Sequence, residues 1–157
     1  MDHELVEIDE DKTLPRPPEA LVLKNVFRQR KAAREAIPPF SEAKTALPVP
    51  ILPENPELLE MYWRAWEMAW ASLKRPKMDS GFVANFIDPT INENLFMWDT
   101  AFMVQFGVYG RRAFPFINAL DNFYAKQHDD GFICREINME DGKDFFPPFD
   151  PDATGPN

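Results

Sequence analysis

The sequence is poor in cysteine, histidine and glycine. Among its 157 residues there are one cysteine, two histidines and six glycines. The single thiol, Cys134, cannot form an internal disulfide or supply a cysteine-based zinc site, and it favours a reducing compartment. The sequence also lacks a glycine-rich phosphate loop, a His-Glu-x-x-His motif and a Gly-x-Ser-x-Gly elbow. We therefore expect no cofactor and no metal.

Basic residues and long hydrophobic runs are scarce as well. The 17 Lys and Arg residues face 26 Asp and Glu residues, which gives a net charge of −9. Nucleic-acid binding depends on Lys and Arg neutralising phosphates, so we expect no nucleic-acid partner. No segment is long and apolar enough to span a membrane, and residues 1–11 do not resemble a signal peptide. These features favour a cytoplasmic protein whose partner is neutral, cationic or polyhydroxylated.

Proline, in contrast, is abundant and divides the chain. Eight of the 16 prolines lie at or before Pro53. Proline has no N–H to donate and restricts the residue before it, so proline-rich stretches favour extended or turn conformations. We predict that residues 1–53 form an extension, either a wrapping arm or a linker, with one short helix at about 19–36. Residues 54–157 are predicted to form the folded part.

Helical periodicity is clearest just after this boundary. Asn55 and Pro56 are typical of a helix N-cap and first position, and the pattern ends near Arg75. Aromatic and apolar residues recur at three- and four-residue spacing. They are Leu59, Tyr62, Trp63, Trp66, Ala69, Trp70 and Leu73. We interpret this stripe as core; a platform for carbohydrate is the alternative.

Two further helices are predicted, at about 94–109 and 112–128, after an ordered loop at 77–93. The second of them ends before a turn, and a short extended segment follows at 132–137. Three helices joined by loops predict an all-α fold.

Trp98 and Asp99 lie near the start of the helix predicted at 94–109. A pyranose presents apolar C–H faces ringed by hydroxyl groups. An indole can stack on such a face, and a neighbouring carboxylate can accept two hydroxyl hydrogen bonds. The alternatives are a core tryptophan and an aspartate that balances the helix dipole.

A second pair, Arg135 and Glu136, follows the third predicted helix. Adjacent opposite charges are usually solvated or pair with other segments, which is the alternative to a role in a pocket. In an extended segment adjacent side chains point to opposite faces, so at most one of the two can point into a given pocket. A helical hairpin brings the start of its first helix close to the end of its second. We therefore expect both pairs at one end of the hairpin.

Other polar residues give weaker signals. The acidic side chains near the C-terminus, Glu140, Asp141, Asp144, Asp150 and Asp152, do not have the spacing of a calcium-binding loop. His128 has no serine or cysteine partner nearby in sequence, so a catalytic triad is unsupported. We interpret His128 as a helix C-terminal residue that interacts with the dipole.

Five stretches, in order, resemble a known family. They are Tyr62-Trp63-Arg64-Ala65-Trp66-Glu67, Ser80-Gly81-Phe82-Val83, Phe96-Met97-Trp98-Asp99-Thr100-Ala101-Phe102, Tyr109-Gly110-Arg111-Arg112-Ala113-Phe114 and Asp130-Gly131-Phe132-Ile133-Cys134-Arg135-Glu136-Ile137. In these stretches, residues 53–157 resemble the mannosylglycerate hydrolase-like glycoside hydrolases, which are relatives of glycoside hydrolase family 63. Residues 1 to about 50 are not covered.

The resemblance implies the N-terminal part of an (α/α)6 toroid that hydrolyses an α-glycosidic bond with inversion, using one carboxylic acid and one carboxylate. The substrate would be an oligosaccharide or a small glycoside such as mannosylglycerate or glucosylglycerate. Trp98 and Asp99 would contribute to the sugar-binding pocket, and Arg135 and Glu136 would line or support it. The family's general acid and base lie in later motifs, so no catalytic residue is assigned here.

Length points the same way. Twelve helices of about 12 residues with connections of about 6 need more than roughly 200 residues. We expect an incomplete toroid that is inactive alone, needs the remainder of the catalytic domain to complete its fold, and exposes an apolar face. The alternatives are a self-contained carbohydrate-binding or helical interaction module, and the toroid of a sugar epimerase or lyase.

Overall fold

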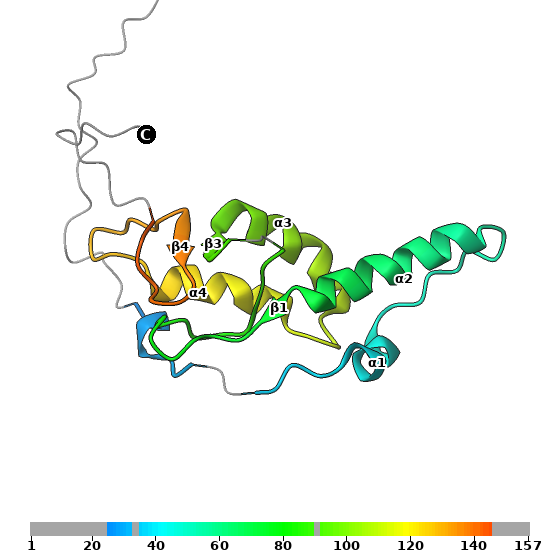
Figure 1. Cartoon of the computed structure of the whole chain (residues 1–157), viewed down its shortest axis with the longest axis horizontal. Helices are drawn as coiled ribbons and strands as arrows, with labels where there is room; N and C mark the ends of the chain where they lie inside the picture. The colour runs from blue at the N-terminus through cyan, green and yellow to red at the C-terminus, as the bar shows by residue number, and fades with distance from the viewer. Residues whose placement is uncertain (1–24, 33–34, 90–91, 146–157) are drawn as a thin grey trace, which may run out of the picture.

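The computed structural model describes residues 25–32, 35–89 and 92–145. Its elements, in chain order, are η2 (Phe27–Gln29), α1 (Phe40–Ala43), η3 (Lys44–Ala46), α2 (Pro56–Ala71), β1 (Leu73–Lys74), β2 (Phe86–Ile87), β3 (Asn94–Phe96), α3 (Met97–Gly107), η4 (Val108–Gly110), η5 (Phe116–Asn118), α4 (Ala119–Ala125) and β4 (Glu136–Asn138). Helices α3 and α4 pack against each other, and the longer α2 projects from one end of this pair (Figure 1). Within these ranges no helix is both long and apolar enough to cross a bilayer.

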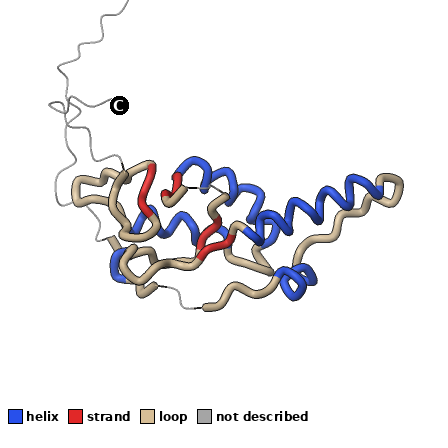
Figure 2. The backbone as a smooth tube through the Cα atoms, in the orientation of Figure 1, coloured by secondary structure: helices blue, strands red, loops and turns tan. Residues whose placement is uncertain are grey.

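The fold class is mixed. The described residues form four α-helices and two small antiparallel sheets, with about 43% helix and 9% strand, so the prediction of an all-α N-terminal part of an (α/α)6 toroid is wrong. Each sheet has two strands, seen as the short red segments of Figure 2: β1 pairs with β2, and β3 pairs with β4. Strands of two or three residues are too short to show a period of two in the sequence.

Tertiary pairing moves the helix boundaries away from the predicted ones. Helix α2 begins at Pro56 as predicted but ends at Ala71, because Leu73 and Lys74 pair with β2 instead. The helix predicted at 94–109 is a strand up to Phe96. The helix predicted at 112–128 is helical only at α4, after a 3₁₀ turn that follows Pro115, whose ψ of 67° is not helical.

The apolar side chains form two buried clusters, and β2 lies between them. One cluster joins the β3–β4 side to α3 and α4, and contains Phe82, Phe86, Leu95, Val104, Ala119, Phe123, Cys134, Ile137 and Met139. The other joins α2 to the N-terminal segment, and contains Ala43, Leu47, Trp66, Ala69, Trp70, Ile87, Phe114 and Phe116. Adjacent strand residues point to opposite faces, so Phe86 and Ile87 serve different clusters. Burial of Trp66 and Trp70 confirms the core interpretation of the α2 stripe.

Residues 25–32 and 35–53, here called the arm, pack along the body of the protein (Figure 1). At one end Phe27 stacks on Tyr124 of α4, with ring centroids 5.1 Å apart. Further along, the indole N–H of Trp70 donates to the Pro38 carbonyl at 2.7 Å. Where a helix is predicted at 19–36, the described residues contain only the 3₁₀ turn η2, and residues 19–24 and 33–34 lie outside the described ranges.

Candidate functional site

Trp98 and Asp99 lie in the first turn of α3, where β3 leads directly into the helix. The Trp98 side chain is 66% exposed, so it is not part of the core. Its ring meets that of Phe102 edge-on, with centroids 5.8 Å apart. Thr100, on the buried side of the same turn, fixes the helix start because its hydroxyl donates to the Phe96 carbonyl at 2.7 Å. The turn thus presents an indole to solvent beside a partly exposed carboxylate.

The β3–β4 ladder places Arg135 and Glu136 next to this turn. Phe96 is the register partner of Glu136, and the Met97 N–H donates to the Arg135 carbonyl at 2.8 Å. The expectation that the two pairs lie at one end of the α3–α4 hairpin is therefore confirmed. The link is a strand pairing, which the sequence pattern did not predict, and not only the packing of the two helices.

Arg135 and Glu136 differ in burial. Arg135 is exposed, whereas Glu136 is only 6% exposed and accepts a hydrogen bond from the Asn94 amide at 2.8 Å. The Asn138 amide in turn donates to the Asn94 side-chain oxygen at 3.2 Å. Glu136 thus ties the two strands together below the surface, so its geometry suits support of the site better than direct contact with a ligand.

The described acidic residues after β4 each have a partner side chain. His128 lies three residues beyond the end of α4, and its Nε2 is 2.7 Å from the Asp144 carboxylate. Asp141 pairs with Lys143 at 2.7 Å, and Glu140 pairs with Lys77 at 3.4 Å. Asp150 and Asp152 lie outside the described ranges. Among the residues that the structure describes, no group of three or more His, Cys, Asp or Glu side chains is arranged to hold a metal ion.

Lys126 is a half-buried cation that sequence reasoning did not single out. Its ammonium group donates to the Ser80 carbonyl at 3.0 Å. Burial lowers the pKa of Lys126 from its usual value, while the nearby carboxylates of Asp144 and Asp141 oppose the shift. Because this lysine bonds a backbone carbonyl in the segment between β1 and β2, its role in the described structure is to hold that segment to the end of α4.

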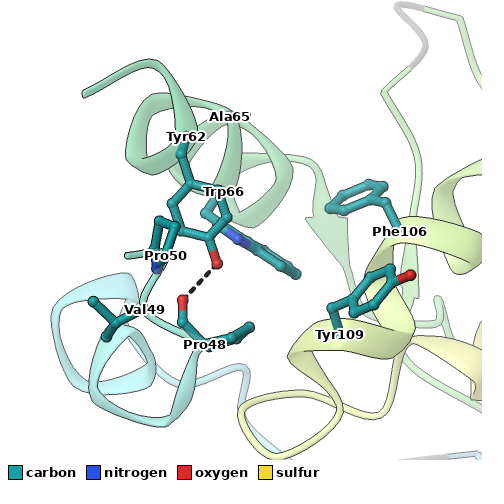
Figure 3. Close-up of a pocket in the computed structure, with 8 residues that line it drawn as sticks. All are labelled: Pro48, Val49, Pro50, Tyr62, Ala65, Trp66, Phe106 and Tyr109. Atoms are coloured by element: carbon teal, nitrogen blue, oxygen red, sulfur yellow. Dashed lines mark hydrogen bonds between the residues drawn. The ribbon is translucent and has the colours of Figure 1, made fainter. Parts of the chain in front are cut away.

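A separate apolar pocket of about 350 Å³ opens between the arm, α2 and the far end of α3 (Figure 3). It is lined by Pro48, Val49, Pro50, Tyr62, Ala65, Trp66, Phe106 and Tyr109. Figure 3 shows Phe106 and Tyr109 facing α2 and the arm across the opening. The Tyr62 hydroxyl donates to the Pro48 carbonyl at 2.5 Å and so fixes the arm against α2.

Sequence reasoning missed this pocket, because the spacing of its aromatic residues fits core positions of the helices equally well. Only the docking of the arm against α2 turns part of that stripe into a pocket wall. Among the described residues the candidate surfaces are the exposed turn at Trp98 and Asp99 and the aromatic pocket at the other end of α3. Comparison of the chain with protein-family models, with curated proteins and with solved structures finds no match.

Proposed function

We propose that this chain contributes the sugar-contacting surface of a glycoside hydrolase that acts on a small α-glycoside or oligosaccharide. The observation that carries the proposal is the exposed indole of Trp98, which stands beside the Asp99 carboxylate in the first turn of α3. The resemblance of five ordered sequence stretches to mannosylglycerate hydrolase-like enzymes supports the same function.

The chemistry of the turn suits a pyranose. The face of the Trp98 ring offers apolar area for the sugar C–H groups, and its edge-on neighbour Phe102 limits the directions in which the ring can turn. A carboxylate accepts hydrogen bonds from two adjacent hydroxyl groups, which gives orientation to a ligand that stacking alone would leave free to rotate. The net charge of −9 fits a hydroxyl-rich ligand with at most one negative charge better than a polyanion.

Under this proposal the four residues have different tasks. Trp98 and Asp99 contact the sugar, and Arg135 lies beside them where β4 begins. Glu136 is a positioning residue, because its buried carboxylate holds Asn94 and thereby the strand that leads into α3. Cleavage by inversion needs a separated acid and base in addition to these residues. We therefore expect residues 1–157 to bind sugar without hydrolysing it.

Calorimetric titration of the full chain with glucosylglycerate and with mannosylglycerate tests the proposal. We expect saturable binding of one of the two, weakened at least about tenfold by Trp98→Ala or Asp99→Asn, since each removes one type of contact. The matched control is Tyr109→Ala, which removes another exposed aromatic ring beyond the far end of α3 and should leave binding unchanged.

Two results would overturn the proposal. One is an affinity for both glycosides that is unaffected by either substitution. The other is the absence of binding at concentrations of about 10 mM by a chain whose cooperative thermal unfolding shows that it is folded. Hydrolytic turnover by residues 1–157 that Asp99→Ala abolishes would contradict the assignment of a purely binding role.

A further inference from the structure

A second pocket adjoins the aromatic one. It has a volume of about 400 Å³ and is lined by Thr45, Ala46, Leu47, Pro48, Val108, Tyr109, Arg111 and Arg112. Pro48 and Tyr109 line both pockets, so the two spaces share a wall made by the arm and η4. One compartment is apolar and the other carries two guanidinium groups.

The arginines of this second pocket differ from their counterparts elsewhere in the described chain. Arg28, Arg30 and Arg64 each form an ion pair with a carboxylate. For the exposed side chains of Arg111 and Arg112 no ion-pair partner is found among residues 25–32, 35–89 and 92–145, and no acidic residue lines the pocket beside them. Two adjacent positive charges in a protein of net charge −9 form a local site for an anion.

The aromatic compartment is suited to an apolar ring. Trp66 borders it from α2 and Phe106 from the end of α3, with ring centroids 5.2 Å apart. Tyr109, which is 76% exposed, lies on the same side as Phe106 and also faces α2 and the arm, so an inserted ring would gain apolar contact on more than one side (Figure 3). The Tyr62 hydroxyl is already bonded to Pro48, which leaves this compartment better suited to an apolar ring than to a sugar.

We propose that the two compartments form one binding site for a small aromatic carboxylate. Its ring occupies the pocket bordered by Trp66 and Tyr109, and its carboxylate meets Arg111 and Arg112, since the planar guanidinium group matches a carboxylate with two parallel hydrogen bonds. The site is separate from the sugar-contacting turn: the part of α3 from Trp98 to Gly107 alone rises about 14 Å at 1.5 Å per residue, and Tyr109 lies beyond it in η4.

Titration calorimetry of the full chain with 1-naphthoate, with the neutral analogue 1-naphthalenemethanol and with acetate tests this site. We expect saturable binding of naphthoate, at least about tenfold weaker binding of the alcohol, and no measurable binding of acetate. The double variant Arg111→Gln/Arg112→Gln should lower the affinity for naphthoate at least about tenfold and leave the affinity for the alcohol unchanged. Raising the salt concentration should lower the affinity for naphthoate in the unsubstituted protein and leave it unchanged in the double variant.

Matched controls separate the two compartments from general effects. Arg64→Gln removes a guanidinium group that is paired with Glu67 and lines neither pocket, so naphthoate affinity should not change. Tyr109→Ala should weaken naphthoate and the alcohol alike, whereas Trp98→Ala should affect neither. The proposal would be overturned by equal affinity for the acid and the alcohol, or by unchanged naphthoate affinity in the double arginine variant or in Tyr109→Ala. It would also be overturned if a folded chain did not bind naphthoate below about 1 mM.

Discussion

At the scale of single residues, Gly142 occupies a position that no other residue type fits. Its φ of 68° lies in the left-handed region, and a Cβ at this position would come within 1.8 Å of the Ser80 carbonyl oxygen. The Gly142 N–H also donates to the Asn138 carbonyl at 2.9 Å, which closes the turn after β4. The turn can lie against Ser80 only because this residue has no side chain.

Gly142→Ala should therefore destabilise the protein more than a change of backbone preference alone. The left-handed conformation costs an alanine about 1–2 kcal/mol, and displacement of the Ser80 backbone adds to that cost. We expect the free energy of unfolding, measured by urea denaturation, to fall by about 3 kcal/mol.

The matched control for Gly142→Ala is Gly131→Ala. Gly131 also has a positive φ, 94°, but an added Cβ would meet no atom within 4 Å. Only the conformational cost of about 1–2 kcal/mol applies there. Equal losses of stability in the two variants would show that the contact with Ser80 plays no part.

At the scale of elements, Asn122 joins α4 to the segment between β1 and β2. Its side-chain oxygen accepts the N–H groups of Val83 and Ala84, both at 2.9 Å, and its amide donates to the Ala84 carbonyl at 3.1 Å. The residue is fully buried. Val83 and Ala84 are outside any helix or strand, so the Asn122 side chain supplies the hydrogen bonds that their buried backbone groups need.

Asn122→Leu keeps the approximate volume of the side chain but removes all three hydrogen bonds. Two N–H groups and one carbonyl are then left buried without a partner, at about 1–3 kcal/mol each. We expect urea unfolding to show a loss of at least about 3 kcal/mol. The same substitution at the exposed Asn118 should cost less than about 0.5 kcal/mol, and similar losses at both positions would contradict this account.

Local signals predicted some elements and missed others for physical reasons. The start of α2 was predicted correctly because Asn55 and Pro56 act through their own backbone. The strand β1 was missed because Leu73 pairs with Ile87, and nothing near Leu73 in sequence encodes that partner. At the site, the pairing of Phe96 with Glu136 is a contact between distant segments, so only the proximity of the two pairs was predicted.

The two faces of α3 explain why its outward residues were hard to assign. Val104 is buried, but Trp98 and Phe102 are exposed although they have the same apolar character. Periodicity identifies which residues share a face of the helix. When both faces are apolar, it does not identify the face that packs on the core. The aromatic pocket was missed for a related reason, because its residues have the spacing of core residues.

At the scale of the whole molecule, several large apolar side chains are exposed along α3 and η4. Trp98, Phe102, Val108 and Tyr109 are all exposed there. An apolar area of this kind is unusual on a monomeric protein and is more typical of a surface that another protein surface covers. The proposal that the remainder of a catalytic domain packs on this chain is consistent with it.

We therefore expect the isolated chain to self-associate and to bind a hydrophobic dye. Analytical ultracentrifugation should show a concentration-dependent increase in mass, and Trp98→Gln/Phe102→Gln should reduce both the association and the dye fluorescence. Met78→Gln, which changes a highly exposed methionine in a loop, is the control and should change neither. A monodisperse monomer without dye binding would contradict the expectation.

The arm also sets the order in which the chain can fold during its synthesis. The Asn25 amide bonds the Tyr124 carbonyl across 99 residues, and Arg28 pairs with Asp129 across 101 residues. The ribosome produces the arm first, but the partners at the end of α4 follow about 100 residues later, at about 5–20 residues per second. For several seconds the nascent arm therefore has no docking surface at α4. Its proline-rich composition disfavours helix or sheet during this interval, which keeps the arm available for docking once α4 has been synthesised.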